Sequence, residues 1–513
     1  MRCDLDGLVQ ALPDCSAYAL LRSLVEADDW LPSALGRVSV EHVVTDSRDV
    51  VPGDVFVALS GLETDGRRFI GNAVAAGAVL VLQPGDEFDI REDDGYWLAS
   101  VPDLSRHLLP LLQLRYSNAA SVTLLAVTGT NGKSSITQYV AQLATELGYG
   151  CGVIGTVGNG VWPRLSPTRN TTPGIAVMYR VLDEFARHGA RFAAVEVSSH
   201  GLDQGRVDGL KFAVVALTNL TQDHLDYHGD MESYFLAKRR LFTDFGARNA
   251  LVNADDEYGQ RLMSELAPEL PIFPVTSSVP VASGDACVGW SLNAYGDFGM
   301  KAQIRSPWGK RQFDLPLIGD FNLANTAMAI GMLASQGVSF DALVEAAETL
   351  RPVAGRMELF CRTESPTVVL DFAHTPDALR NVLQSLAHWS KPITLVYGCG
   401  GDRDRSKRPL MTEIALKHAQ TVILTDDNPR YEDPDQIWAD ALSVEGAERI
   451  HCEHNRQLAI EYAVSIARSN ELIVIAGKGH EDYQDICGEK LPFSDLNVLN
   501  ELGYRRAGEE CDR

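Results

Sequence analysis

Short apolar runs alternate with helix-like segments along most of the chain. Residues 122–127 form an apolar run of strand character, followed by a turn rich in Gly, Thr and Asn. After the turn, apolar residues recur at helical spacing until Gly148, which is suited to cap the helix: Ile136, Tyr139, Val140, Leu143 and Leu147. Strand-like runs follow at 191–198, 212–220 and 250–254. Apolar strands that alternate with helices predict a largely parallel sheet.

The same alternation occurs before and after this region. The first part of the chain has Val-rich, turn-punctuated stretches at 53–59 and 78–86, which suggest a small α/β domain. The last part begins near Arg351-Pro352 and has four strand-like runs: 367–373, 392–398, 421–427 and 471–479. Each run leads into a Gly-bearing or charged loop, where a doubly wound sheet binds its ligands. We therefore predict an α/β protein with three domains, at residues 1–115, 116–350 and 351–513.

Length and charge support this division and exclude some functions. The chain has 513 residues, which at about 150 residues per domain corresponds to three domains. It has 69 acidic and 45 basic residues, for a formal charge of −24. Nucleic-acid backbones and anionic membranes both attract basic surfaces, so neither is an expected partner. Any anionic ligand must be held by local features.

The cysteines and the N-terminus point to a cytoplasmic location. Nine cysteines are spread thinly, their number is odd, and no CxxC pair occurs. We expect reduced thiols, with neither a disulfide framework nor a zinc site. The sequence MRCDLDGLVQ does not read as a signal peptide, and no apolar run is long enough to span a membrane.

A phosphate loop is predicted between the strand at 122–127 and the helix after it. The loop reads Gly129-Thr130-Asn131-Gly132-Lys133-Ser134, with two residues between its glycines where the usual Walker pattern has four. Glycines let backbone N–H groups close around phosphate oxygens, and the helix N-terminus adds partial positive charge. Lys133 can reach the β- and γ-phosphates, and the Ser134 hydroxyl can ligate Mg²⁺. The alternative is a plain strand-to-helix turn, which the Lys-Ser pair makes the weaker interpretation.

Metal ligands are expected at the ends of two other strands. Glu196 ends one predicted strand, and His224 follows another. Alone, either is more often an ordinary polar residue than a ligand. Mg²⁺ prefers oxygen ligands, so a histidine ligand suggests a second metal position.

Several motifs together resemble the Mur ligases, and among them the members that add diaminopimelate. The motifs are GTNGKS, EVSSHGL, TNLTQDHLDYHGDM, Ala237-Lys238, GDFNLAN (319–325), GRME (355–358), DFAHTPDAL (371–379) and GCGGDRDRSKRPLM (398–411). They occur in order over nearly the whole chain. The resemblance implies an N-terminal domain for a UDP-sugar, a central P-loop ATPase-like domain, and a C-terminal Rossmann-like domain for an incoming amino acid.

The resemblance also implies a reaction of peptidoglycan precursor synthesis. The D-Glu carboxylate of UDP-N-acetylmuramoyl-L-Ala-D-Glu would attack ATP and form an acyl phosphate. The amine of meso-diaminopimelate would then displace phosphate. Two Mg²⁺ sites are implied, served by Ser134, Glu196, His224 and a carbamylated Lys238 (N6-carboxylysine). Spacing alone would favour an ordinary surface lysine at position 238, and we expect the chain to act as a monomer.

The implied nucleotide and sugar sites are as follows. ATP would bind Gly129, Thr130, Asn131, Gly132, Lys133, Ser134, Ser135, Asn322, Asn325, Arg356 and Asp371. The UDP-linked dipeptide would bind Thr45, Ser47, Leu62, Glu63, Thr64, Asn170, Thr171, Thr172, Ser198, Gln204 and Arg206. Thr45 stands where an apolar residue is common in relatives, and Leu62 where a polar one is common. Without the resemblance, GDFNLAN reads as a turn before a helix, with Asn325 as a local cap.

The implied amino-acid site contains one residue that decides between related enzymes. Diaminopimelate would bind Arg403, Asp427, Asn428, Pro429, Arg430, Gly477 and Glu481. Arg430 can hold the second carboxylate of diaminopimelate, which lysine lacks, while Glu481 can pair with the distal ammonium. The alternative for 427–430 is a helix-capping turn. The basic run 403–408 is either a solvated loop or an anion site, and its place after a strand favours the latter.

Two other functions remain open at this stage. One is another ligase of the superfamily, either a lysine-adding enzyme or a folylpolyglutamate synthase. The other is a P-loop switch or transport ATPase that makes no amide. A second predicted anion-binding loop, at 427–430, in addition to the phosphate loop, argues against the switch.

Overall fold

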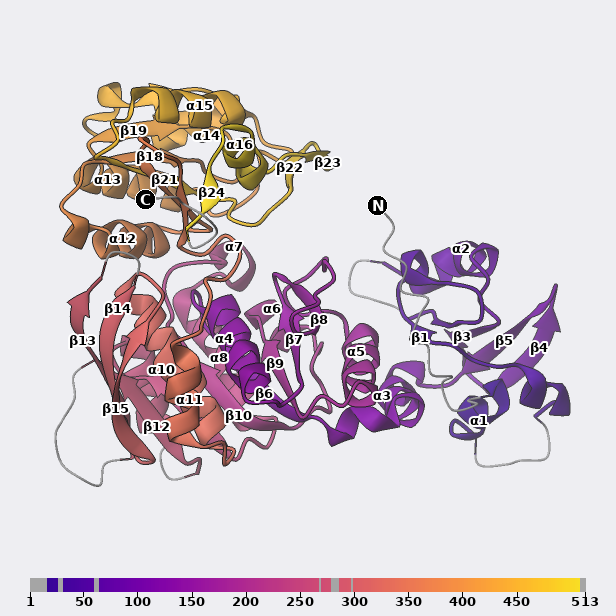
Figure 1. Ribbon diagram of the computed structural model, residues 1–513. Helices are drawn as coiled ribbons and strands as arrows, with labels where there is room; N and C mark the ends of the chain where they lie inside the picture. Colours follow the sequence, from indigo (N-terminus) through magenta and orange to yellow (C-terminus); the bar gives the residue numbers. More distant parts are fainter. Residues whose placement is uncertain are drawn as a thin grey trace. The chain divides into compact units, whose positions relative to one another are not determined.

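The computed structural model describes residues 16–25, 31–59, 64–266, 269–277, 286–296 and 299–507. The chain forms two compact units (Figure 1). The first comprises Met1–Thr123, Pro173–Ala193 and Gln204–Leu210, and the second Leu124–Thr172, Ala194–Asp203 and Lys211–Arg513. The units are described separately below.

The first unit has a five-stranded sheet in its described part. The strands, in spatial order, are β1 (Val43–Val44), β2 (Val55–Val57), β3 (Leu80–Pro84), β5 (Tyr96–Val101) and β4 (Asp89–Asp93). All neighbours are parallel except the edge pair β4 and β5. The predicted stretches at 53–59 and 78–86 are thus confirmed as strands. The helices are α1 (Ala17–Arg22), η1 (Ser33–Arg37), η2 (Ser47–Asp49), η3 (Gly66–Phe69), α2 (Ile70–Ala75), α3 (Leu104–Arg115), η4 (Ser117–Ser121) and α5 (Ile175–Arg187).

The second unit begins with a ten-stranded sheet, counted over the described residues. In spatial order it has β15 (Gly309–Leu315), β14 (Met300–Ser306), β13 (Val288–Tyr295), β12 (Ile272–Thr276), β11 (Asn249–Asn253), β10 (Phe212–Leu217), β6 (Thr123–Thr128), β9 (Phe192–Glu196), β7 (Cys151–Gly155) and β8 (Gly158–Val161). The run from β6 through β10 to β13 is parallel, as predicted, whereas β14, β15 and β8 pair in antiparallel fashion. The associated helices are α4 (Lys133–Glu146), α6 (Ser199–Asp203), α7 (Leu225–His228), α8 (Met231–Thr243), α9 (Glu257–Leu266), α10 (Asp320–Ala334) and α11 (Phe340–Ala347).

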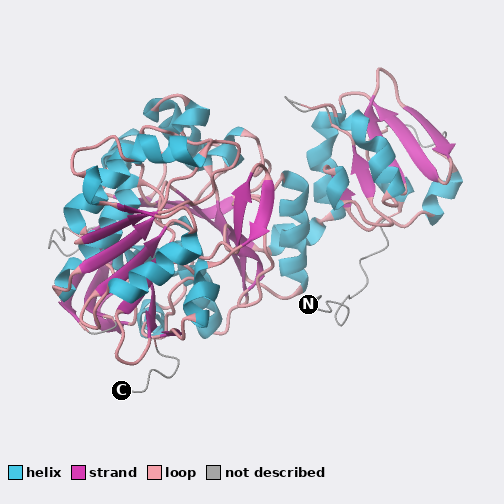
Figure 2. Cartoon of the chain, turned by 90° about the horizontal axis from the view of Figure 1, so that it is seen from above, coloured by secondary structure: helices cyan, strands magenta, loops and turns pink. Residues whose placement is uncertain are grey.

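A seven-stranded sheet occupies the C-terminal part of the same unit. In the described residues its order is β20 (His451–Cys452), β19 (Thr421–Leu424), β18 (Ile393–Tyr397), β21 (Leu472–Ala476), β17 (Thr367–Asp371), β16 (Glu358–Cys361) and β24 (Arg505–Arg506). The four runs predicted there are β17, β18, β19 and β21, which are neighbours and parallel. Helices lie along this sheet (Figure 2): α12 (Pro376–Ser385), η5 (Ala387–Trp389), α13 (Lys407–His418), α14 (Pro434–Ala441), η6 (Ala447–Arg449), α15 (Arg456–Ile466) and α16 (Asp495–Glu501). A hairpin, β22 (Tyr483–Ile486) and β23 (Glu489–Pro492), follows β21.

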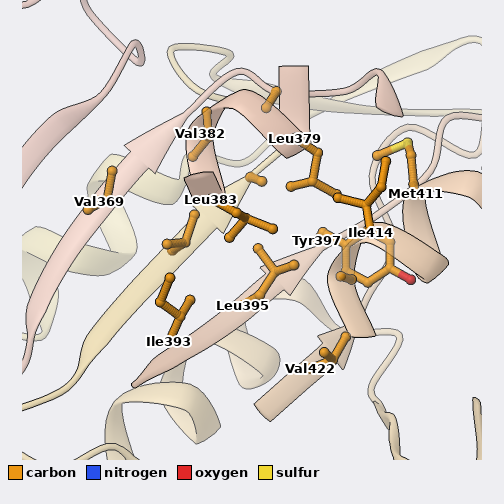
Figure 3. Packing of buried hydrophobic residues seen from close by; sticks show 14 of the residues in the cluster. Val369, Leu379, Val382, Leu383, Ile393, Leu395, Tyr397, Met411, Ile414 and Val422 are labelled. Atoms are coloured by element: carbon orange, nitrogen blue, oxygen red, sulfur yellow. The ribbon is translucent and has the colours of Figure 1, made fainter. Parts of the chain in front are cut away.

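Side chains of α12, α13 and β18 form the core on one face of this sheet (Figure 3). Leu379 and Leu383 of α12 pack with Met411 of α13 and with Leu395 and Tyr397 of β18, and all five are at most 1% exposed. Burying each such side chain contributes about 1.5–3 kcal/mol. This packing fixes the end of β18, so the loop that follows starts from a rigid point.

The cysteine prediction is wrong at one position. Cys361, the last residue of β16, is disulfide-bonded. Cys151 and Cys399 are buried free thiols, as expected. In the described part of the chain, no helix combines the length and apolar character needed to cross a membrane.

Candidate active site

The predicted phosphate loop joins β6 to α4. Gly129 and Gly132 both have positive φ, 142° and 88°. A Cβ on Gly129 would lie 1.8 Å from Thr218 Oγ1, and one on Gly132 would lie 2.9 Å from Asn325 Oδ1. Backbone conformation and close neighbours therefore both require glycine at these positions. The loop ends at the N-terminus of a fourteen-residue helix, whose dipole favours anions.

Lys133 folds back over the loop that precedes it. Its Nζ donates hydrogen bonds to the carbonyl oxygens of Gly129 and Thr130, both at 2.8 Å. Burial lowers the pKa of Lys133, while the charge of Glu196 acts in the opposite direction. The amine is thus held against the loop that would cradle phosphate.

Glu196, the last residue of β9, is fixed by three donors. Ser134 Oγ donates to Oε2 at 3.1 Å. Thr156 donates from its backbone N to Oε1 at 2.9 Å and from its Oγ1 to Oε2 at 3.1 Å. Burial raises the pKa of Glu196, opposed by the charge of Lys133 and by these hydrogen bonds. A Cβ on Gly155 would lie 2.1 Å from Oε1, so the carboxylate needs glycine beside it.

Lys238 is not the surface lysine that spacing alone would favour. The residue is only 2% exposed, and its Nζ donates to the carbonyl oxygen of Gly129 at 2.9 Å. The amine also lies 4.5 Å from the ring centroid of Tyr234. Burial, and after it the charge of Lys133, lower the pKa of Lys238 well below its usual value. A neutral amine is the nucleophilic form that reaction with carbon dioxide requires.

His224 lies just before α7, in the left-handed region at φ 55°. Its Nε2 is 3.4 Å from Asp223 Oδ2, and its ring centroid is 6.1 Å from that of Tyr234. Burial lowers the pKa of His224 to about 3, so the imidazole is neutral near neutral pH. Neutral imidazole is the form that ligates metals.

The residues proposed as metal ligands fit Mg²⁺ only in part. Ser134 and Glu196 bring two oxygen donors together, which suits a Mg²⁺ ion that keeps water and phosphate as its other ligands. Lys238 as an ammonium cannot ligate a cation, and it fits a second metal only as a carbamate. Over the described residues, no three His, Cys, Asp or Glu side chains converge as a metal site.

Arg356 of the C-terminal sheet region contacts the phosphate loop, and Asp371 lies near Arg356. An Arg356 Nη donates to Ser134 Oγ at 3.4 Å, and its guanidinium stacks 4.3 Å from the Phe372 ring centroid. The buried Nε of Arg356 has no hydrogen-bond partner in the described residues. Asp371 accepts backbone hydrogen bonds from Met357 and Ala373, both at 2.8 Å. Burial raises the pKa of Asp371 to about 6, against the charge of Arg356.

The two asparagines of GDFNLAN lie in the first part of α10. Asn322 accepts from the Tyr139 hydroxyl at 3.0 Å and donates to the carbonyl of Ile318 at 2.8 Å. Its side chain therefore ties α10 to α4. Asn325 is closer to the phosphate loop, beside Gly132.

Three loops predicted to bind the amino acid lie at one edge of the C-terminal sheet, because β19, β18 and β21 are parallel and are three consecutive strands of that sheet. Arg430 is clamped there by its backbone, which donates to Asp485 O at 2.9 Å and accepts from Cys487 N at 2.7 Å. Its Nη1 donates to Gly401 O at 2.7 Å. Burial, and then the nearby charge of Arg403, lower the pKa of Arg430. Within the described residues, no carboxylate lies within 4.0 Å of the guanidinium of Arg403 or of Arg430. Both guanidiniums are therefore available to an anion.

Three of the four cations in the basic run 403–408 have carboxylate neighbours within the chain, and Arg403 and Arg405 of the run are exposed. Arg405 pairs with Asp440 at 2.8 Å. Arg408, with a fully buried side chain, pairs with Glu432 at 2.6 Å and Asp440 at 2.8 Å. Lys407 Nζ lies 3.7 Å from Asp223. Carboxylates of the chain thus lie beside Arg405, Lys407 and Arg408, and Arg403 is the cation of this run that is available to a ligand.

The predicted sugar-site residues are divided between the two units. In the second unit, Thr172 Oγ1 donates to Glu196 O at 2.8 Å and accepts from Ser198 N at 3.0 Å. Thr171 Oγ1 lies 3.0 Å from Thr156 Oγ1, and Asn170 precedes it. These residues border the end of β9, beside the phosphate loop.

In the first unit, an Arg206 Nη donates to Gln204 Oε1 at 2.5 Å. Thr45 and Ser47 flank Asp46, which caps η2, and Thr64 precedes the η3 cap. Leu62 and Glu63 lie outside the described residues.

Two residues that the sequence did not single out belong to these sites. Thr156 holds Glu196, and its only signal in the sequence is its place after a strand. Lys478 lies between Asn428 and Glu481, inside the Gly477–Glu481 segment. A lysine between two glycines after a strand was a usable signal for the second.

Family models match all three predicted regions of the chain. Residues 39–98 match the Mur ligase family, catalytic domain; residues 127–333 match the Mur ligase middle domain; and residues 355–479 match the Mur ligase, glutamate ligase domain. The chain belongs to the Mur ligase family.

Curated Mur ligases resemble it over most of their length. A UDP-N-acetylmuramoyl-L-alanyl-D-glutamate–2,6-diaminopimelate ligase of Vibrio cholerae is 42% identical over 478 residues, covering 91% of this chain and 95% of the relative. The enzyme of the same name from Chromobacterium violaceum is 41% identical over 493 residues, covering 93% and 97%. That of Neisseria meningitidis serogroup A is 42% identical over 463 residues, covering 89% and 93%.

Solved structures of Mur ligases share the fold. A structure of a UDP-N-acetylmuramoyl-L-alanyl-D-glutamate–2,6-diaminopimelate ligase has 34% identity and a TM-score of 0.62, covering 95% of this chain and 98% of that one. A MurF ligase from Thermotoga maritima in complex with ADP has 16% identity and a TM-score of 0.62, covering 85% and 94%. These likenesses confirm the α/β class and the three-domain Mur ligase architecture.

Proposed function

We propose that this chain is an ATP-dependent amide ligase that joins meso-diaminopimelate to UDP-N-acetylmuramoyl-L-Ala-D-Glu in cytoplasmic peptidoglycan precursor synthesis. The observation that carries the proposal is the Arg403–Arg430 pair. Both guanidiniums lie at the ligand-binding edge of the C-terminal sheet without a carboxylate partner among the described residues. A second carboxylate at the far end of the amino acid would accept charge-assisted hydrogen bonds from both guanidiniums. The names of relatives at 41–42% identity agree with this substrate.

The first half of the reaction brings two anions together. The D-Glu carboxylate attacks the γ-phosphorus of ATP, an acyl phosphate forms, and ADP leaves. Lys133 and the N-terminus of α4 offset the repulsion between carboxylate and triphosphate. Ser134 and Glu196 would hold Mg²⁺, which supplies further positive charge when bound. Thr156 keeps the Glu196 carboxylate turned toward Ser134.

The second half forms the amide. The amine of diaminopimelate attacks the acyl carbon, loses a proton, and inorganic phosphate leaves with the bonding electrons of the C–O bond. Arg403 and Arg430 hold the distal carboxylate of the amino acid, and Glu481 holds its distal ammonium. Losing a fixed charge partner in such a pocket discriminates strongly between substrates.

Lys238 is proposed to be carbamylated in the active enzyme. The burial that lowers the pKa of Lys238 favours the neutral amine. Carbamylation would replace a buried cation by an oxygen ligand for a second Mg²⁺, together with His224. The modification would also remove the like charge beside Lys133.

The remaining assignments extend the same proposal. We place the UDP-sugar domain at 1–115, the ATP domain at 116–350 and the amino-acid domain at 351–513, in a monomeric enzyme. The UDP-linked dipeptide would bind Thr45, Ser47, Thr64, Gln204 and Arg206 together with Asn170 to Thr172 and Ser198.

Phosphate release tests the function directly. Purified protein is supplied with ATP, Mg²⁺ and the UDP-linked dipeptide, and then with meso-diaminopimelate, lysine or glutamate. We expect turnover with diaminopimelate and little with the other two. Equal turnover with lysine would contradict the proposed specificity. Glutamate turnover on a folate acceptor would favour a folylpolyglutamate synthase, and release without any dipeptide would favour an ATPase switch.

A further inference from the structure

Lys478 is wholly buried among the residues proposed to read the amino acid. Its side chain is 0% exposed. The Nζ lies 2.9 Å from Glu481 Oε2, 3.0 Å from Asn428 Oδ1 and 4.0 Å from Asp427 Oδ1. A buried lysine with three polar partners from two loops holds those loops in one arrangement.

The hydrogen bonds around Lys478 leave one carboxylate oxygen for a ligand. Asn428 Nδ2 also donates to Glu481 Oε2, at 2.9 Å, so Lys478, Asn428 and Glu481 form a closed triangle. Asn428 Oδ1 in addition accepts from Asp485 N at 3.0 Å, which fixes the orientation of the amide. Within the described residues no hydrogen bond falls on Glu481 Oε1, and the Glu481 side chain is 20% exposed. Oε1 is therefore the atom presented to a substrate ammonium.

The charges of the pocket give Lys478 a second effect. Arg403 and Arg430 carry two positive charges, and the carboxylates that act on Arg430, those of Asp427, Asp485 and Glu481, carry three negative ones. Lys478 adds one positive charge beside the carboxylates of Asp427 and Glu481. The far end of diaminopimelate carries both an ammonium and a carboxylate, whereas the far end of lysine carries only an ammonium. A pocket with less uncompensated negative charge favours the former over the latter.

We infer that Lys478 is a specificity-determining positioning residue, which aims Glu481 and limits the pull of its carboxylate on a purely cationic side chain. The inference rests on the proposed function. In the same sheet region, Arg456 and Asp495 form a fully buried ion pair at 2.7 Å. Asp495 is not one of the residues proposed to bind the amino acid. Lys478 differs because its hydrogen-bond partners, Asn428 and Glu481, are themselves proposed to bind the amino acid.

The test compares Lys478→Met and Lys478→Arg with a matched surface change, Lys490→Met. Lys490 is exposed on the neighbouring hairpin and lies 3.9 Å from the ring centroid of Tyr483, which Lys478 also approaches, at 5.5 Å. The measured quantities are kcat and KM for meso-diaminopimelate and for lysine, and the KM for ATP. For Lys478→Met we expect the KM for diaminopimelate to rise about 10-fold or more, as for loss of a charged hydrogen bond. The ratio of kcat/KM for diaminopimelate to that for lysine should fall, with the KM for ATP unchanged.

Two further variants show whether Lys478 acts through Glu481. In a Glu481→Gln background, Lys478→Met should cause no further change in the substrate ratio. In the wild-type background, Lys478→Arg should keep part of the substrate ratio that Lys478→Met loses. An unchanged ratio in Lys478→Met, or equal losses for ATP and both amino acids, would overturn the inference while leaving the ligase function intact. If the wild-type protein does not use diaminopimelate at all, the proposed function itself fails.

Discussion

Lys238 donates a hydrogen bond to the carbonyl oxygen of Gly129 at 2.9 Å, so a buried amine of α8 contacts the first glycine of the phosphate loop. A second amine, that of Lys133, binds the same carbonyl at 2.8 Å. Two amines on one acceptor repel each other, and the charge of Lys133 contributes to the lowered pKa of Lys238. The arrangement favours a form of Lys238 that is not a cation.

Lys238→Ala should therefore abolish ligase activity, and a short carboxylic acid such as formate should restore part of it. The added acid would supply the oxygen that the carbamate supplies in the wild type. Lys238→Arg retains a cation that cannot be carbamylated, and it should stay inactive with or without formate. The measurement is phosphate release as a function of formate concentration. Full activity in a protein shown by intact mass to carry an unmodified Lys238 would refute the carbamate.

Thr156→Val should weaken catalysis because Glu196 loses its side-chain donor at 3.1 Å. A hydrogen bond to a charged group contributes about 1.5–3 kcal/mol, so kcat should fall about 10- to 100-fold. Thr243→Val is the matched control, because among the residues that the structure describes the exposed Thr243 hydroxyl bonds to Arg239 and Asp244 alone, at the C-terminal end of α8. A Thr156 variant with wild-type kcat and wild-type Mg²⁺ dependence would show that the backbone donor alone orients Glu196.

Arg430→Ala should raise the KM for diaminopimelate about 10- to 100-fold, since one charge-assisted contact to the distal carboxylate is lost. The KM for ATP should stay within a factor of two or so. Arg405→Ala removes a guanidinium from the same region, but one already paired with Asp440, and should affect diaminopimelate much less. Steady-state kinetics with each substrate varied in turn provide the comparison. Equal loss for ATP and diaminopimelate would mean that Arg430 acts only on the fold.

The raised pKa of Asp371 predicts how the stability of the fold depends on pH. This pKa is about 6 in the folded protein, above the ordinary value of 3.8. A raised pKa means that the protonated carboxyl is favoured in the fold, so its contribution is present below pH 3.8 and is lost as the pH rises through 6. Relative to Asp371→Asn, the wild type should lose about 3 kcal/mol of unfolding free energy between pH 4 and 8. Thermal unfolding midpoints of both proteins over that range provide the measurement, and a difference that is flat or grows with pH would contradict the raised pKa.

Local features of the fold could be predicted from the sequence. The strand, glycine turn and helix around Lys133 are contiguous, so spacing and residue type determine them. Arg430 could be placed at a strand end for the same reason. The four C-terminal runs could be assigned to a doubly wound sheet, because each has an apolar stretch and leads into a Gly-bearing or charged loop.

Long-range pairing could not be read from the sequence. Arg405 and Arg408 look like anion-binding residues until Glu432 and Asp440 are seen to neutralise them. Lys238 looks like a surface residue because lysines are rarely buried, and only the packing of α8 reveals otherwise. The partners of Glu196 are Ser134 of α4 and Thr156, which follows β7. Both are far from Glu196 in the chain, so the sequence did not indicate the role of Thr156.

Oxygen transfer tests the central claim most directly. The D-Glu side-chain carboxylate of the UDP-linked dipeptide is labelled with ¹⁸O, and the reaction is run with ATP, Mg²⁺ and meso-diaminopimelate. If the chain makes an amide through an acyl phosphate, each turnover should move one labelled oxygen into the released phosphate. Phosphate that takes its new oxygen only from water would contradict the account, because ATP would then be hydrolysed without activating the carboxylate.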